Sequence, residues 1–233
     1  MDIVNSTDRV ARVDKDKVHR TISTFVDDSI KILLKYDITI DKFLGDGLLA
    51  FSNDPIAHTD FMNRTVLAAL EIRRQVKSRQ NFYEDNWMAP LEIRIGIASG
   101  FANVGFYGNE KYFKSYTAIG PVINLASRLC NTALSNQIVC SSEVLEKIDK
   151  NEFQIKSLGK VTLKGFEADT IKAFEINSVA EQTSENLADI ECTVCSTGLL
   201  YLDTDANGHY ILKCRNCGAI KDQTTSSLRK KVA

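Results

Sequence analysis

Two acidic residues, Asp2 and Asp46, lie at positions from which carboxylates of different strands can converge. Residues 38–44 and 48–51 are short apolar runs, and Gly45-Asp46-Gly47 between them has the composition of a hairpin turn. Asp2 lies at the end of an expected strand, so the two side chains can meet where adjacent strands come together. Carboxylate oxygens are preferred ligands of Mg²⁺ and Mn²⁺. The pair is therefore a candidate site for divalent cations.

A second polar pair, Asn124 and Arg128, lies on a helix predicted over residues 121–133, with Pro121 in its first turn. The two residues are four apart, so they share one helical face. This face points roughly 130° away from the apolar stripe of the helix, which contains Val122, Leu125, Ala126 and Leu129. The pair is therefore directed outward, and by itself such a pair usually belongs to a solvated face.

Four cysteines near the C-terminus form two pairs, Cys192-x-x-Cys195 and Cys214-x-x-Cys217. The 18 residues 196–213 separate the pairs, and a spacing of about 15–20 is typical of four-thiolate zinc sites. Two strands, over residues 199–202 and 210–212, are expected around Ala206-Asn207-Gly208, which is the plan of a zinc ribbon. So short a segment has too little core to fold without a metal, and two disulfides fit a cytoplasmic chain poorly. One structural Zn²⁺ is therefore expected, whereas the partner or signal of the ribbon is unknown.

Three separated segments carry a resemblance to a known family. They are residues 1–7, which begin Met-Asp-Ile, residues 41–51, which contain Gly-Asp-Gly, and residues 116–129, YTAIGPVINLASRL. In this order, with Leu163-Lys164-Gly165 as a fourth motif, they resemble the catalytic domain of the class III nucleotidyl cyclases, the adenylate and guanylate cyclase family. The resemblance covers residues 1 to about 177. It implies conversion of a nucleoside triphosphate to a 3′,5′-cyclic nucleotide and pyrophosphate, by two-metal catalysis at a homodimer interface.

The resemblance also implies a role for each matching residue. The carboxylates of Asp2 and Asp46 and the backbone carbonyl of Ile3 match the groups that bind two Mg²⁺ or Mn²⁺ ions. Asn124 matches the residue that orients the ribose, and Arg128 the one that stabilises charge on the α-phosphate in the transition state.

Contacts to the other phosphates are matched only in part. Lys164 resembles the lysine that contacts the terminal phosphates. The family's phosphate-binding arginine has no clear match between Gly108 and Thr117, where Lys111 and Lys114 are the candidates to replace it.

Lys42 and Thr117 match the two positions that read the base. Adenylate-making members carry a lysine at the first position, and often Asp or Thr at the second, so the pair argues against guanine. The leading interpretation is an adenylate cyclase. Two alternatives remain: a cytidylate or uridylate cyclase of a bacterial anti-phage system of the Pycsar type, and an inactive cyclase-like protein that binds a nucleotide or a partner.

Apolar periodicity predicts the elements that must position these residues. Helices are expected over residues 18–34, 61–76 and 121–133, and strands over residues 38–44, 48–51, 91–98, 116–120, 161–163 and 171–176. Gly100, Gly105 and Gly108 are expected to break the chain. The mixed order indicates an α+β fold with a largely antiparallel sheet, and the resemblance implies a ferredoxin-like sheet flanked by helices. The first strand of the family is expected to be missing or to lie upstream, because only Met1 precedes Asp2.

Composition limits the remaining possibilities. The chain has 233 residues, 44% of them apolar, enough for one substantial core and a small appendage. The expected divisions are a catalytic domain (1–177), a linker (178–190), the zinc ribbon (191–221) and a basic tail (222–233). Lys and Arg number 29 against 30 Asp and Glu, so no net basic field exists to attract nucleic acid or an anionic membrane. Without an apolar run of about 18 residues, the chain is expected to be soluble and cytoplasmic.

Overall fold

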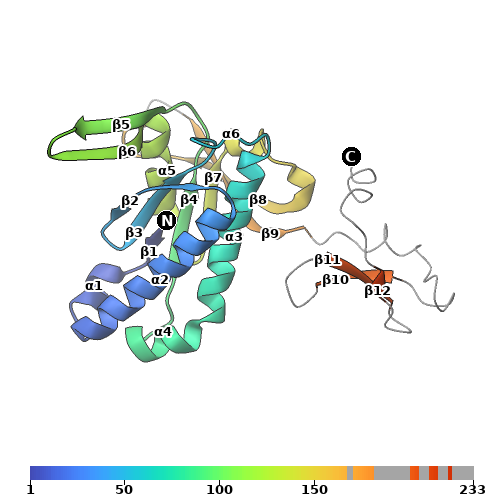
Figure 1. The fold of residues 1–233 in the computed structure, drawn as a ribbon, viewed down its shortest axis with the longest axis horizontal. Coiled ribbons are helices and arrows are strands. Elements are labelled where there is room, and N and C mark those ends of the chain that lie inside the picture. The colour runs from blue at the N-terminus through green and yellow to red at the C-terminus, as the bar shows by residue number, and fades with distance from the viewer. Residues whose placement is uncertain (167–169, 181–199, 205–209, 215–219, 222–233) are drawn as a thin grey trace. The chain divides into compact units, whose positions relative to one another are not determined.

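The computed structural model describes residues 1–166, 170–180, 200–204, 210–214 and 220–221 (Figure 1). The chain separates into two compact units, Met1–Ala180 and Glu181–Ala233. Within the described residues, no helix combines the length and the apolar character needed to cross a membrane.

A five-stranded sheet forms the centre of the first unit, in the order β1-β4-β7-β9-β8. β4 and β7 are parallel, and the other three neighbouring pairs are antiparallel. The strands are β1 (Asp2–Ile3), β4 (Ile93–Ile97), β7 (Ile138–Ser141), β8 (Phe153–Val161) and β9 (Ile171–Val179). The predicted α+β fold with a largely antiparallel sheet is therefore confirmed.

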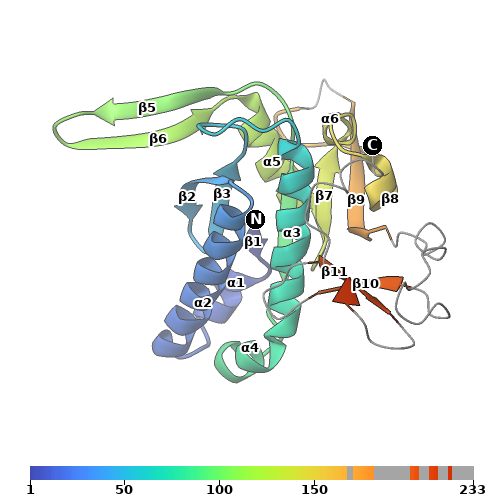
Figure 2. The ribbon, with the colours of Figure 1, turned by 45° about the vertical axis from the view of Figure 1, so that its right-hand side comes forward.

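Helices α2 (Lys15–Lys35) and α3 (Phe61–Ser78) cover one face of this sheet (Figures 1 and 2). Alternate side chains of β4 are buried, because successive residues of a strand face opposite sides of the sheet. The inward residues of β4 form one core with the two helices, which includes Phe25, Leu33, Val66, Ile72, Ile93, Ile95 and Ile97.

Helix α5 (Pro121–Thr132) packs against β4 on the other face. Gly96 makes this close approach possible, because a Cβ at Gly96 would lie 2.2 Å from the carbonyl oxygen of Ala126 and 2.3 Å from the backbone nitrogen of Cys130. A smaller core adjoins α5 and consists of Leu129, Ala133, Val139, Leu163 and Ala173. The predicted helix is thus present, and backbone packing determines its position.

Two β-hairpins lie outside the central sheet. β2 (Thr39–Leu44) pairs with β3 (Gly47–Phe51), and Gly45 in the turn between them has a φ of 70°, which favours glycine. β5 (Asn103–Asn109) pairs with β6 (Phe113–Ile119). This second hairpin extends from the body of the unit as an arm (Figures 1 and 2).

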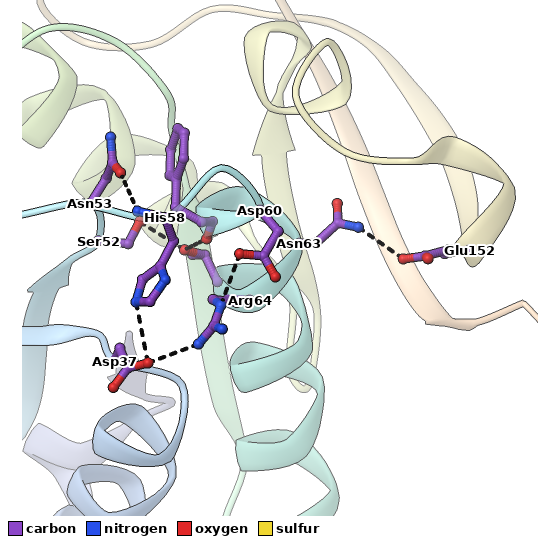
Figure 3. Close-up of polar contacts among 10 residues, drawn as sticks. Asp37, Ser52, Asn53, His58, Asp60, Asn63, Arg64 and Glu152 are labelled. Carbon is purple, nitrogen blue, oxygen red and sulfur yellow. Dashed lines mark hydrogen bonds and ion pairs between the residues drawn. The ribbon is translucent and has the colours of Figure 1, made fainter. Parts of the chain in front are cut away.

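Polar contacts hold the segment that joins β3 to α3 (Figure 3). Asp37, which follows α2, accepts a hydrogen bond from Arg64 Nη1 (2.8 Å) and lies 3.2 Å from His58 Nε2. Arg64 Nε also donates to Asp60 (3.0 Å), and Thr65 Oγ1 donates to Ser52 Oγ (2.9 Å). These contacts join α2, α3 and the end of β3, and so support the β2–β3 hairpin.

Four short helices and two strands of the first unit were not predicted. They are α1 (Ser6–Val10), α4 (Gln80–Trp87), α6 (Ser142–Leu145), the 3₁₀-helix η1 (Lys150–Glu152), β5 and β7. All four residues of β7 are buried, so the strand lacks the alternation by which a half-buried strand is recognised. α4 buries Tyr83 and Trp87 one turn apart, within a helix too short to show a clear period.

Several boundaries differ from the expectations. A strand was expected over residues 161–163, whereas β8 runs from Phe153 to Val161. Gly105 and Gly108 lie inside β5 and do not interrupt the chain, and Gly108 has a φ of 124°, which a residue with a side chain rarely adopts. β9 continues to Val179, so the first two residues assigned to the linker pair with β8.

Cys130 and Cys140 are both buried and free. Burial raises the pKa of the Cys140 thiol to about 12, and it also raises the pKa of Cys130. Both thiols are therefore neutral at physiological pH and pack as small apolar side chains.

The second unit contains an antiparallel sheet of β10 (Leu200–Thr204), β11 (Tyr210–Cys214) and β12 (Ile220–Lys221). β10 and β11 occupy the regions where two strands were expected, whereas β12 was not predicted. Cys192, Cys195 and Cys217 lie outside the described residues, and of Cys214 only the backbone, at the end of β11, is described.

Candidate active site

β1 and the β2–β3 turn place Asp2 beside the residues that follow Asp46. Met1 and Leu48 exchange two hydrogen bonds of 3.0 Å between their backbone nitrogens and oxygens, which joins the start of β1 to β3. A Cβ on Gly47 would lie 3.2 Å from Asp2 Oδ1, so only glycine leaves this space open. The predicted convergence of the two acidic segments is therefore found.

Arg94 holds the carboxylate of Asp2. Arg94 lies opposite Asp2 in the β1–β4 register, and its Nη2 and Nε donate to Asp2 Oδ2 at 2.6 Å and 3.1 Å. The other oxygen, Oδ1, is the one beside Gly47. Arg94 was not predicted as a site residue, although the alternation in residues 91–98 places it on the face of β4 opposite the buried isoleucines.

The donor atoms of this pair suit a hard divalent cation. Asp46 Oδ2 is buried and has no hydrogen-bond partner within the described part of the chain, and a buried carboxylate oxygen is costly unless a donor or a cation satisfies it. No group of three or more His, Cys, Asp or Glu side chains in the described residues could hold a metal by itself. Asp2 and Asp46, with the carbonyl of Ile3, would therefore have to share a cation with oxygens of a ligand, as Mg²⁺ commonly does with phosphates.

A buried polar cluster links β2 to β6. Lys42 Nζ donates to Thr117 Oγ1 at 2.9 Å, so the structure brings together the two residues predicted to read the base. Thr117 Oγ1 lies 2.8 Å from each carboxylate oxygen of Asp41, which also accepts from the backbone nitrogen of Ala118 (3.1 Å). Asp41 was not predicted as a site residue, because its partners are distant in the sequence and belong to another hairpin.

Asn124 and Arg128 project from a different side of α5. Asn124 is exposed, Arg128 is half-buried, and neither side chain forms a hydrogen bond or ion pair with another described residue. A cavity of about 580 Å³ lies beside Asp2 and Gly47, and α5 lines it with Val122, Ile123, Ala126, Ser127, Cys130 and Asn131. By helical periodicity Asn124 and Arg128 point away from that cavity, so one chain does not bring them to its own carboxylates.

The three lysines proposed for phosphate contacts lie apart from these groups. Lys164 is exposed in the loop between β8 and β9, next to buried Leu163, and makes no hydrogen bond or ion pair with the described residues. In the β5–β6 arm, Lys111 Nζ lies 5.4 Å from the ring centroid of Tyr112, and Lys114 donates to Glu110 at 2.8 Å. None of the three contacts Asp2 or Asp46 within the described structure.

Comparisons with known proteins agree with this arrangement. The family model described as the adenylate and guanylate cyclase catalytic domain matches residues 1–178. The chain is 31% identical over 173 residues to Rv1319c, an uncharacterized protein of Mycobacterium tuberculosis, and 27% identical over 152 residues to adenylate cyclase 1 of Rhizobium meliloti. These matches cover 73% and 64% of this chain but 31% and 23% of the relatives, so the chain spans about a third or less of their length.

A solved structure extends the similarity to three dimensions. The adenylyl cyclase CyaB from P. aeruginosa matches with a TM-score of 0.72 and 29% identity, over 77% of this chain and 92% of that chain. The cyclase family generally uses Mg²⁺ or Mn²⁺, in agreement with the oxygen donors of Asp2 and Asp46. The chain therefore belongs to the adenylate and guanylate cyclase catalytic domain family.

Proposed function

We propose that the chain is an adenylate cyclase, which converts ATP to 3′,5′-cyclic AMP and pyrophosphate at sites shared by two copies of the chain. The observation that carries the adenine assignment is the hydrogen bond of 2.9 Å between Lys42 and Thr117. This hydrogen bond holds the ammonium group of Lys42 in a place where it can donate to a ring acceptor such as adenine N1. Two similar proteins that are named adenylate or adenylyl cyclases, at 27% and 29% identity, support the same assignment.

In the proposed reaction the ribose 3′-oxygen attacks the α-phosphorus, the bond to the bridging oxygen breaks, and pyrophosphate leaves. Asp2, Asp46 and the carbonyl of Ile3 would hold divalent cations, which favour the 3′-oxyanion and neutralise phosphate charge when they are bound. Arg94 donates twice to Asp2 Oδ2 and so fixes the orientation of that carboxylate.

The substrate contacts come from polar side chains that have no partner among the described residues. The amide of Asn124 would orient the ribose, and the guanidinium of Arg128 would stabilise the charge that develops on the α-phosphate. Lys164, exposed beside a turn, would contact the terminal phosphates. Each side chain is open to a ligand, since none of them is engaged within the described part of the chain.

A second copy of the chain would bring together the metal-binding carboxylates and the Asn124–Arg128 pair, which lie apart within one chain. Asp2 lines a cavity on one side of α5, next to the Gly47 that follows Asp46, and Asn124 and Arg128 project from another side, so a homodimer would combine the two groups at each of two equivalent sites. The β5–β6 arm offers an apolar surface for such a partner, with exposed aromatic side chains at Phe106, Tyr107, Tyr112 and Phe113.

We also propose that Cys192, Cys195, Cys214 and Cys217 hold one structural Zn²⁺ in a ribbon over residues 191–221. The support is their spacing in the sequence.

Cyclic products from ATP, GTP, CTP and UTP, each offered separately with Mg²⁺ or Mn²⁺, test the proposed activity. We expect cyclic AMP to form with the highest kcat/KM. A preference for CTP or UTP would replace the adenylate assignment with a pyrimidine cyclase. A folded chain that binds ATP but yields no product from any triphosphate would contradict the catalytic proposal.

A further inference from the structure

We propose that Asp41 is a positioning residue of the base site: it holds Thr117, and together with Thr117 it places the ammonium group of Lys42 that reads the base. This inference rests on the proposed function and adds one residue to its base site.

The first step is the protonation pattern of Thr117. Lysine ammonium groups only donate hydrogen bonds, so Thr117 Oγ1 must accept from Lys42 (2.9 Å). An ionised carboxylate only accepts, and both oxygens of Asp41 lie 2.8 Å from Thr117 Oγ1. The single hydroxyl proton of Thr117 is therefore directed to Asp41, so Thr117 Oγ1 can act toward a ligand only as an acceptor.

The second step is exposure. The side chain of Asp41 is 0% exposed and Thr117 is 5% exposed, whereas the side chain of Lys42 is 45% exposed. A base that approaches this cluster therefore meets the lysine, and the threonine and the aspartate lie beneath it.

The third step is the geometry of the ammonium group. Lys42 Nζ donates to Thr117 Oγ1 at 2.9 Å and forms an ion pair of 3.2 Å with Asp41 Oδ1, so two groups of the protein hold the ammonium and it keeps an N–H for a ligand. Asp41 itself is held by the backbone nitrogen of Ala118 on β6 (3.1 Å), which makes the cluster rigid and spares a flexible lysine the entropy cost of ordering on binding.

One analogue of ATP isolates the contact of Lys42 with the base. 1-Deaza-ATP keeps the 6-amino group but lacks the N1 acceptor. We expect 1-deaza-ATP to lose about 10- to 100-fold in kcat/KM relative to ATP, the effect of removing a hydrogen bond to a charged donor. Dissociation constants measured by calorimetry should give the same ranking, so the test does not require turnover.

Asp41→Asn tests the positioning role. In this variant kcat/KM and affinity for ATP should fall toward the values for 1-deaza-ATP. The kcat/KM and affinity for 1-deaza-ATP should stay nearly unchanged, because the position of Lys42 matters only when the base has an acceptor at N1. Thr117→Val should act in the same way, and Thr117→Ser, which keeps the hydroxyl, should restore the ATP preference. Asp27→Asn is the matched control, since Asp27 forms an exposed ion pair with Lys31 and should leave all values unchanged.

Two results would overturn the inference. Equal losses for ATP and 1-deaza-ATP in Asp41→Asn would make Asp41 only a structural link between β2 and β6. Equal binding of ATP and 1-deaza-ATP by the unmodified chain would remove Lys42 from the base. A chain that shows the expected ranking in binding but forms no cyclic product would contradict the proposed activity and leave this inference intact.

Discussion

Two acidic side chains of the candidate metal site differ in how much of their charge the protein satisfies. Asp2 Oδ2 receives two hydrogen bonds from Arg94, whereas Asp46 Oδ2 is buried and has no partner among the described residues. Leaving a buried carboxylate oxygen unsatisfied costs free energy, and such a cost is common where a ligand completes the site. The imbalance supports a cation shared by Asp2 Oδ1 and Asp46.

At this scale we predict that Arg94→Lys weakens metal binding. Lysine keeps the charge but loses the paired donation of Nε and Nη2 to one oxygen. The Mn²⁺ concentration that gives half-maximal activity should rise about 10-fold or more, and saturating Mn²⁺ should restore most of the rate. Arg64→Lys, in the polar network of Figure 3, serves as the control. An unchanged Mn²⁺ dependence would show that Arg94 does not position Asp2 for a metal.

Among the elements, the position of α5 depends on a single residue of the neighbouring strand β4. Gly96 allows the helix backbone to touch β4, and this contact determines which face of α5 lines the cavity and which face presents Asn124 and Arg128. The polar pair thus owes its direction to a glycine on another element.

We therefore predict that Gly96→Ala destabilises the first unit by about 2 kcal/mol or more, because its methyl group would meet backbone atoms that cannot rotate away. Gly105→Ala is the matched control, since a Cβ there has no neighbour within 4 Å, and its effect should stay within about 0.5 kcal/mol. Urea unfolding, followed by tryptophan fluorescence at buried Trp87, measures both. Equal midpoints for the two variants would refute the close packing of α5 on β4.

The cysteine pairs of the second unit give a prediction that depends on spacing alone. The purified chain should contain about one zinc per protomer, and Cys214→Ser should release it and expose residues after Asp189 to proteolysis. Cys130→Ala, at a buried cysteine outside the pairs, should keep the zinc. Atomic emission on dialysed protein gives the stoichiometry, and a metal-free chain with two disulfides would exclude the ribbon.

For the whole molecule, the separation of the two catalytic groups predicts complementation between inactive variants. Asp46→Ala should remove a metal ligand from a hairpin turn without unfolding the chain, and Arg128→Ala should remove the α-phosphate contact. Random mixing of equal amounts yields heterodimers in about half of the dimers, each with one intact site, so activity should recover to about a quarter of that of the unmodified chain. The activity of the mixture is compared with that of each variant alone, and native mass spectrometry shows that heterodimers form. Recovered activity would support a site shared between two chains. Heterodimers that form and stay inactive would rule out a shared site.

The sequence by itself determined the local elements and the residues able to do chemistry. The helical periodicity of α2, α3 and α5 and the Gly-Asp-Gly turn are properties of short segments, and the order of the motifs led to the correct family. The short strand β7 was not predicted, because its four residues are all buried and show no alternation of apolar and polar side chains.

Only the tertiary structure decided which of these residues meet. Asp2 and Arg94 are 92 positions apart, Asp41 and Thr117 are 76 apart, and each pair lies on different elements brought together by sheet register and hairpin packing. The spacing of apolar residues within one segment cannot predict such contacts, because they depend on the register between β1 and β4 and on how closely β2 packs against β6. Helical periodicity already separates Asn124 and Arg128 from the apolar stripe of α5. Which part of the molecule that stripe faces follows from the packing of α5 on Gly96, a contact between backbones that no side-chain pattern reveals.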